Sequence, residues 1–269
     1  MSVAIAALAK RADGKLPLIP SGTLTMRKIA DADVRKGDEV RKVQLLMLTG
    51  VGFTPGFVWA TEGEAPRMFA LIYPGYLHLI EDGWQANADA LEQIQRGSEN
   101  SALIDMQKRL AKPLAGTTLI RNARVFDSEA ATLGPASDLL LRNGRIVSIS
   151  DAGQEKAPAQ QVIDAGGRVV LPGLYDMHGH VGEWQGGLHL AAGVTTVRDM
   201  GNDNASLQRL MAAERAGKLM SPSVVPAGFI EGESPMSARN GFVIKDLAGA
   251  KRAVDWYAKN GYPQIKIYN

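Results

Sequence analysis

The stretch at residues 171–180 reads LPGLYDMHGH and holds two of the chain's four histidines. An apolar run precedes the pair, which predicts a buried strand that ends here. Side chains alternate between the two faces of a strand, so Asp176, His178 and His180 are expected to point the same way. Two imidazoles on one face of one strand can hold a transition metal. The alternative interpretation is that both histidines are polar residues at the end of a strand.

The composition sets wide limits on the fold and on the partners. With 269 residues, the chain is long enough for one large domain or two smaller ones. Its 45% hydrophobic and 22% charged residues are ordinary for a globular protein. A formal net charge of +2 gives no reason to expect nucleic acid or an anionic membrane as a partner. There is no cysteine, which excludes disulfides and thiolate metal ligands.

The sequence contains no apolar run of the length that a membrane-spanning helix needs. The start, MSVAIAALAKRADGK, has no basic residue ahead of its short apolar stretch, and therefore predicts an N-terminal helix rather than a signal peptide. The cytoplasm is the default expectation for the compartment, and a periplasmic location stays open for a longer parent protein.

Residues 1–113 are expected to form an N-terminal α+β domain of unknown role. Apolar alternation predicts strands, and helical spacing predicts two helices separated by residues 96–99. The predicted strands are 22–29, 40–49, 57–61 and 67–73, and the predicted helices are 87–95 and 102–111. The lone His78 is expected to be a histidine that is hydrogen-bonded within the protein or lies at the surface, because no other candidate metal ligand accompanies it.

Residues 114–172 predict a compact β segment, expected to be a small sandwich. Asn143-Gly144 joins two strand patterns, and this dipeptide favours a tight hairpin because both turn residues need a positive φ. A second hairpin is expected between 161–164 and 168–171. The remaining strand of the segment is predicted at 118–126.

From residue 173 to the end, strand and helix patterns alternate, which predicts a parallel sheet covered by helices. Four strands are expected, near His178, Val197, Val225 and Lys266. The helices are predicted at 183–192, 205–216 and 247–260, and Asn202, Asp203 and Asn204 are the candidate caps of the second.

The last strand, QIKIY at 264–268, places Lys266 on the face opposite to Ile265 and Ile267. If the isoleucines face the helices, the ammonium faces an interior where an unpaired charge costs several kcal/mol. Reaction with carbon dioxide would turn this amine into an anionic carbamate that can bridge two metal ions. The alternative is a lysine that reaches the strand end or pairs with Asp176 or Asp199.

Several stretches together resemble the amidohydrolase superfamily of metal-dependent hydrolases, in particular its imidazolonepropionase-like and prolidase-like branch. The stretches are RNARVFDSE, DLLLRNGRIVSIS, VIDAGGRVVLPGLYDMHGHV, GVTTVRDMG and QIKIYN, which lie between residues 121 and 269. The combination of DAGGRVVLPG with DxHxH is specific, whereas HxH alone is not. The resemblance covers about residues 116–269 and leaves residues 1–113 as an added domain.

The resemblance implies an α/β fold: the N-terminal half of a (β/α)8 TIM barrel in 173–269, beside the small β-sandwich segment of 114–172. It assigns His178 and His180 to a first metal and matches Lys266 to the carboxylated lysine that bridges two metals in many members. The implied cofactor is Zn²⁺, as one or two divalent ions. Asp176 is given only a hydrogen-bonding role, and Asp199 is either a residue of the catalytic face or a structural turn aspartate.

The implied activity is hydrolysis of an amide or related C–N bond, in a dipeptide or a cyclic amide, by a metal-activated water. The family expects further histidines and an aspartate from strands 5 to 8, which would lie after residue 269. We therefore expect the chain to be a truncated domain with little activity alone and with a free Lys266. The alternatives are a non-catalytic fragment, a module that needs a partner chain, and a mononuclear site of HxH only. Small-molecule or dipeptide substrates and self-association through the open barrel edge are the expected partners.

Overall fold

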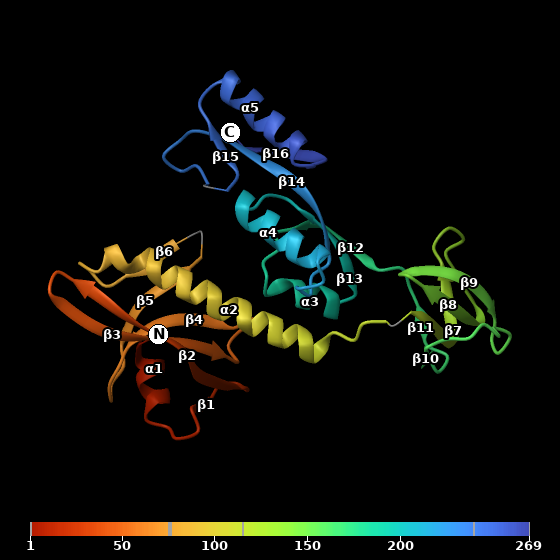
Figure 1. Ribbon diagram of the computed structural model, residues 1–269, viewed down its shortest axis with the longest axis horizontal. Coiled ribbons are helices and arrows are strands. Elements are labelled where there is room, and N and C mark those ends of the chain that lie inside the picture. Colours follow the sequence, from red (N-terminus) through yellow and green to blue (C-terminus); the bar gives the residue numbers. More distant parts are fainter. Residues whose placement is uncertain (1, 75–76, 115, 239, 269) are drawn as a thin grey trace. The chain divides into compact units, whose positions relative to one another are not determined.

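A computed structural model describes residues 2–74, 77–114, 116–238 and 240–268 (Figure 1). By their contacts, the residues divide into two compact units. One unit combines Met1–Arg109 with Tyr175–Asn269, and the other is Leu110–Leu174. No helix among the described residues is long and apolar enough to cross a membrane. The mixed α/β composition with several sheets agrees with the predicted fold class.

The N-terminal part of the first unit is a six-stranded antiparallel sheet in which each strand pairs with the next along the chain. Two helices accompany it, α1 (Ser2–Ala9) and α2 (Ala88–Leu110). The strands are β1 (Lys15–Pro17), β2 (Thr23–Lys36), β3 (Glu39–Thr49), β4 (Gly56–Thr61), β5 (Met68–Tyr73) and β6 (Leu77–Ile80). A short 3-10 turn, Gln85–Asn87, precedes α2. The sequence predicted all of these strands except β1 and β6, and it predicted too short a β2.

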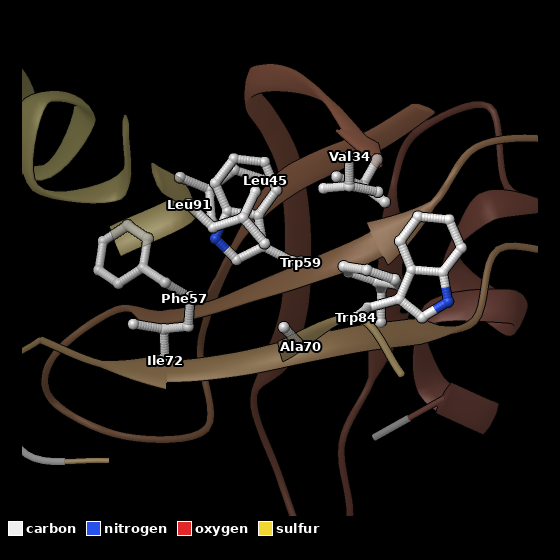
Figure 2. Close-up of a cluster of buried hydrophobic side chains, with 10 residues drawn as sticks. Val34, Leu45, Phe57, Trp59, Ala70, Ile72, Trp84 and Leu91 are labelled. Carbon is white, nitrogen blue, oxygen red and sulfur yellow. The ribbon is translucent and has the colours of Figure 1, made fainter. Parts of the chain in front are cut away.

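Both faces of this sheet are buried, because alternate residues of its central strands pack into different cores. On β4, Trp59 joins a cluster that includes Leu91 of α2, whereas its neighbour Val58 joins a cluster that includes Ile5 and Leu8 of α1. Figure 2 shows the first of these clusters, with Trp59 beside Leu45 and Leu91. The two helices therefore stabilise opposite faces of one sheet.

The prediction of two helices at 87–95 and 102–111 is wrong, because α2 continues through residues 96–99. Leu91, Gln95, Glu99 and Leu103 are all buried and recur every four residues, so they form one stripe of a single helix. Gly97 costs a helix interior about 1 kcal/mol relative to alanine. The burial of residues on both sides of this glycine outweighs that cost.

The second unit is a mixed sheet of five strands: β7 (Thr117–Asp127), β8 (Thr132–Arg142), β9 (Arg145–Asp151), β10 (Gln161–Asp164) and β11 (Val169–Val170). Asn143 and Gly144 have φ values of 52° and 72°, which confirms the predicted turn between β8 and β9. The described strands of this unit form one sheet, so the two-layered sandwich stays a prediction.

The predicted hairpin between β10 and β11 is wrong: both strands run parallel to β7, one after the other. The loop between β10 and β11 does not reverse the chain, because its backbone amides also form hydrogen bonds with β7. The amide of Ala165 donates to the carbonyl of Arg121 at 2.8 Å, and that of Gly167 donates to the carbonyl of Asn122 at 2.7 Å. Gly166 and Gly167 form a pattern that is typical of a hairpin turn, but here their positive φ values allow a bulged loop beside β7.

The C-terminal part of the first unit confirms the predicted strand–helix alternation. Its five-stranded sheet has the order β12-β13-β14-β15, and β16 pairs with residues 227–231 of β14. Strand β14 pairs in parallel with β13, β15 and β16. The strands are β12 (Leu174–Gly179), β13 (Val194–Asp199), β14 (Ser223–Gly232), β15 (Phe242–Ile244) and β16 (Gln264–Tyr268). The helices are α3 (Gln185–Ala191), α4 (Asn204–Arg215) and α5 (Leu247–Lys259).

Helices α4 and α5 pack against this sheet around Tyr257, which is fully buried on α5. Its ring fills the space that a Cβ at Gly228 of β14 would occupy, with the nearest ring atom only 2.4 Å away. Ile265 of β16 packs against the same cluster. Ile265 therefore faces the helices, as predicted, whereas Ile267 is 73% exposed. Lys266 lies on the opposite face of the strand.

Candidate metal centre

The histidine pair lies where β12 ends and the loop toward α3 begins. The ring centroids of His178 and His180 are 5.8 Å apart, and the two ring planes are inclined at 60°. Both side chains are exposed. The i, i+2 spacing therefore brings the two imidazoles together on one side of the strand, as strand alternation predicts.

The backbone beyond β13 sets the tautomer of His180. Its Nδ1 lies 2.6 Å from the carbonyl oxygen of Gly201. A carbonyl oxygen can only accept, so Nδ1 carries the proton and donates it to this bond. In the neutral ring the lone pair is then on Nε2, which is the arrangement that a metal-binding histidine commonly shows. The donor set and this hydrogen bond fit a divalent metal held by His178 and His180.

Asp199 ends β13 and is completely buried. One carboxylate oxygen accepts from the amide of Val181 at 2.7 Å and from Nδ2 of Asn202 at 3.1 Å. The other oxygen accepts from the amide of Gly201 at 3.0 Å. Asp199 thus links Val181, which follows His180, to Gly201, whose carbonyl accepts the hydrogen bond from the His180 ring. Of the two roles considered for Asp199, the contacts support the structural one.

Asp176 has different neighbours from those expected of a residue on the histidine face. Its Oδ1 accepts from the amide of His178 at 3.0 Å, and its Oδ2 lies 3.5 Å from Nε2 of His189 on α3. Its described contacts are therefore with the backbone of the strand and with the helix layer. The hydrogen-bonding role suggested for Asp176 is thus directed at the backbone of His178.

Lys266 lies on the face of β16 that also carries Tyr268, opposite Phe229 of β14. Its Nζ is 4.7 Å from the centroid of the Tyr268 ring and 5.9 Å from that of Phe229. These are cation–π distances, which stabilise an ammonium rather than a neutral amine. Among the described residues, no hydrogen bond or ring contact joins Lys266 to His178 or His180.

Within the ranges that the structure describes, no three His, Asp or Glu side chains gather closely enough to hold a metal. His78, which was expected to be a satisfied histidine, contacts Glu92 of α2 through its Nε2. The structure therefore brings together two of the three residues proposed as metal ligands.

The sequence analysis missed a buried polar cluster that connects α2 to the loop after the histidine pair. Nε1 of Trp184 donates to Glu99 Oε2 at 2.9 Å, and Nε2 of Gln95 donates to Glu99 Oε1 at 2.8 Å. Trp184 also packs against Phe57 of β4, with ring centroids 5.7 Å apart. The four-residue spacing of Gln95 and Glu99 on an otherwise apolar stripe is the one signal that could have revealed it.

Burial raises the pKa of the Glu99 carboxyl above its ordinary value, and the Glu183 carboxylate adds to this rise. The hydrogen bonds from Gln95 and Trp184 and the charge of Arg96 oppose it. The folded protein therefore holds the Glu99 proton more tightly than the unfolded chain does. The stability that this proton contributes is complete below the unfolded pKa and is lost as the pH rises through the folded pKa.

Replacing Glu99 with glutamine is expected to remove this loss. The free energy of unfolding of Glu99→Gln, relative to the parent chain, should therefore rise as the pH increases from about 4 to about 8. Urea denaturation at several pH values measures it. Glu155→Gln is a control of opposite sign, because the Ser148 hydroxyl lowers the pKa of that exposed carboxyl. A relative stability of Glu99→Gln that falls with pH contradicts the prediction.

Comparisons with known proteins find relatives that match part of this chain. The chain is 35% identical over 83 residues to an adenine deaminase of Paracoccus denitrificans, a match that covers 29% of this chain and 14% of the relative. It is 36% identical over 117 residues to a dihydroorotase of Streptococcus pyogenes, covering 38% of this chain and 27% of the relative. The chain thus spans about a quarter or less of these relatives. No protein-family profile matches it.

The fold has a counterpart among solved structures. A protein of Bifidobacterium longum assigned as a prolidase superposes with a TM-score of 0.51 and 22% identity, over 58% of this chain and 41% of that protein. This likeness concerns the fold alone. The sequence matches support the resemblance of this chain to the amidohydrolase superfamily.

Proposed function

We propose that the chain supplies the first metal ligands, His178 and His180, of a metal-dependent hydrolase that cleaves amide or related C–N bonds. The observation that carries this proposal is the hydrogen bond from His180 Nδ1 to the Gly201 carbonyl. In the neutral ring, this bond places the lone pair on Nε2 of His180, and the ring of His178 lies nearby. The resemblance to the amidohydrolase superfamily adds the expectation that this strand end is a catalytic face.

A divalent metal such as Zn²⁺ supplies a Lewis acid that polarises a carbonyl and lowers the pKa of a water molecule. The chain's own residues hold and orient the site. His178 and His180 are the ligands, and Asp199 keeps the two loops around His180 in register through its three hydrogen bonds. Asp176 accepts from the amide of His178 and so restrains the strand next to this ligand.

We further propose that residues 173–269 are the first half of a (β/α)8 barrel, with 114–172 as its β segment and 1–113 as an added domain. The parallel pairing of β13, β14 and β16 supports this interpretation. In a two-metal site, Lys266 would bridge the ions as a carbamate, formed from its neutral amine and carbon dioxide with release of a proton. The aromatic contacts of the ammonium support a free lysine in this chain.

The proposed substrates are a dipeptide, with a C-terminal proline or arginine as examples, or a small cyclic amide. The alternative is a non-catalytic or mononuclear metal-binding module that needs a partner chain. One observation favours it: among the described strands, β16 pairs with β14 alone, so an edge next to Lys266 is open to a further strand. The same edge would serve self-association.

Metal content per chain, measured by elemental analysis after purification without chelators, tests the proposal. The parent chain is expected to hold zinc, and His178→Ala and His180→Ala should each weaken zinc binding at least about tenfold. His78→Ala is the matched control, because this histidine contacts Glu92 and lies in the N-terminal sheet. Equal metal content in all three variants would refute the assignment.

Two further measurements separate the alternatives. Lys266→Ala should lower the metal content if two ions are bridged, and leave it unchanged if the histidine pair binds one ion alone. Hydrolysis of a dipeptide panel then distinguishes an assembled enzyme from a binding module. About two metals per chain together with turnover would contradict our expectation that this chain alone has little activity.

A further inference from the structure

We propose that a cavity beside α2 and the loop after His180 binds the positively charged end of a small amine or guanidine. The cavity has a volume of about 400 Å³, which suits a small molecule. Glu99 of α2 and Glu183 and Trp184 of the loop contribute to its wall. This site is separate from the histidine pair and does not require a metal.

The first argument is the charge of the wall. Glu99, Glu183 and Asp203 contribute three carboxylates to this cavity, against one guanidinium, that of Arg96. Arg96 Nε is already bonded to Glu92 Oε1 at 2.7 Å. The partners of Glu99 are a side-chain amide and an indole, which are neutral donors. These neutral donors supply no counter-charge to the Glu99 carboxyl, and burial disfavours its ionised form, so a cation in the cavity would supply the missing opposite charge and form charge-assisted hydrogen bonds with it.

The second argument is an unpartnered polar atom. Gln95 is 1% exposed, and its Nε2 donates both to Glu99 and to the carbonyl of Ile72. Its Oε1 has no hydrogen-bond partner among the described residues. Gln95 lines a smaller cavity of about 230 Å³ that shares Glu99 and Trp184 with the larger one. A buried acceptor without a partner is costly, and an N–H group of a bound cation would satisfy it.

The third argument is the aromatic lining of the smaller cavity. Phe57, Tyr73 and Trp184 all contribute to it. Aromatic faces attract organic cations and also pack against their alkyl portions. A ligand with a cationic head and a short apolar tail therefore matches the carboxylates of one cavity and the rings of the other. An inorganic cation would leave the aromatic lining unused.

The probe for this site is n-butylguanidinium, and n-butylurea is its uncharged analogue of nearly the same shape. Calorimetric titration of the whole chain should show n-butylguanidinium binding with a Kd of about 1 mM, as expected for so small a ligand. Binding of n-butylurea should be at least about tenfold weaker, because it lacks the charge. Adding a chelator to every titration makes the result independent of the histidine pair.

Three variants locate the binding. Glu183→Gln and Glu99→Gln should each weaken n-butylguanidinium binding about tenfold or more. Asp105→Asn is the matched control, since this carboxylate lies on the same helix and its side chain is 76% exposed. Glu183→Gln alone tests the site if Glu99→Gln fails to fold. Equal binding of the two probes, unchanged binding by Glu183→Gln, or no binding at about 10 mM would overturn the proposal.

Discussion

Replacing Asp199 with alanine is expected to lower the free energy of unfolding by about 3–5 kcal/mol. The side chain is completely buried and accepts three hydrogen bonds, two of them from the backbone amides of Val181 and Gly201. Each buried donor that loses its partner costs about 1–3 kcal/mol. Because the two amides lie on the two loops that position His180, zinc affinity should also fall about 10- to 100-fold. Urea denaturation and zinc titration measure the two effects.

Two other substitutions serve as controls for Asp199→Ala. Asp199→Asn keeps one carbonyl oxygen and nearly the same volume, so its cost should lie between those of the parent chain and Asp199→Ala. Asp203→Ala removes the α4 cap, in which Oδ1 accepts from the amide of Ser206 at 2.8 Å, and should cost about 1 kcal/mol. If Asp199→Ala is no more costly than Asp203→Ala, the carboxylate does not hold the two loops together.

Replacing Trp59 with alanine is expected to cost about 3–5 kcal/mol. Trp59 is completely buried on β4 and packs between β3 and β5 within the cluster that faces α2 (Figure 2). The surrounding strands are paired on both sides, so they can collapse only partly into the space that the indole leaves. The midpoint and slope of urea denaturation, followed by circular dichroism, measure the change.

Trp59→Phe separates loss of volume from loss of polarity at this position. The indole Nε1 is buried without a hydrogen-bond partner among the described residues, so phenylalanine removes an unsatisfied donor while keeping an aromatic ring. We expect Trp59→Phe to cost less than about 1.5 kcal/mol. Similar losses for the alanine and phenylalanine variants would show that packing around Trp59 does not account for the stability of this sheet.

Local sequence patterns predicted those features that depend on neighbouring residues. The i, i+2 spacing of His178 and His180 brought the two rings together, because alternation is a property of a single strand. Asn143-Gly144 predicted its turn, because the φ values are set within the dipeptide. Asp203 was predicted as a candidate helix cap for the same reason, since it bonds only three residues ahead. The motifs around the histidines also sufficed to indicate the superfamily.

Tertiary structure decided what depends on contacts between distant segments. Burial of residues on both sides of Gly97 made α2 one helix, although the local pattern favoured two. Pairing with β7 kept β10 and β11 parallel, although the loop between them resembles a hairpin turn. The link from Glu99 to Trp184 joins positions 85 residues apart, and no local spacing reveals such a bond. Sequence alone therefore determined the histidine pair and its strand, whereas long-range burial and pairing determined what surrounds them.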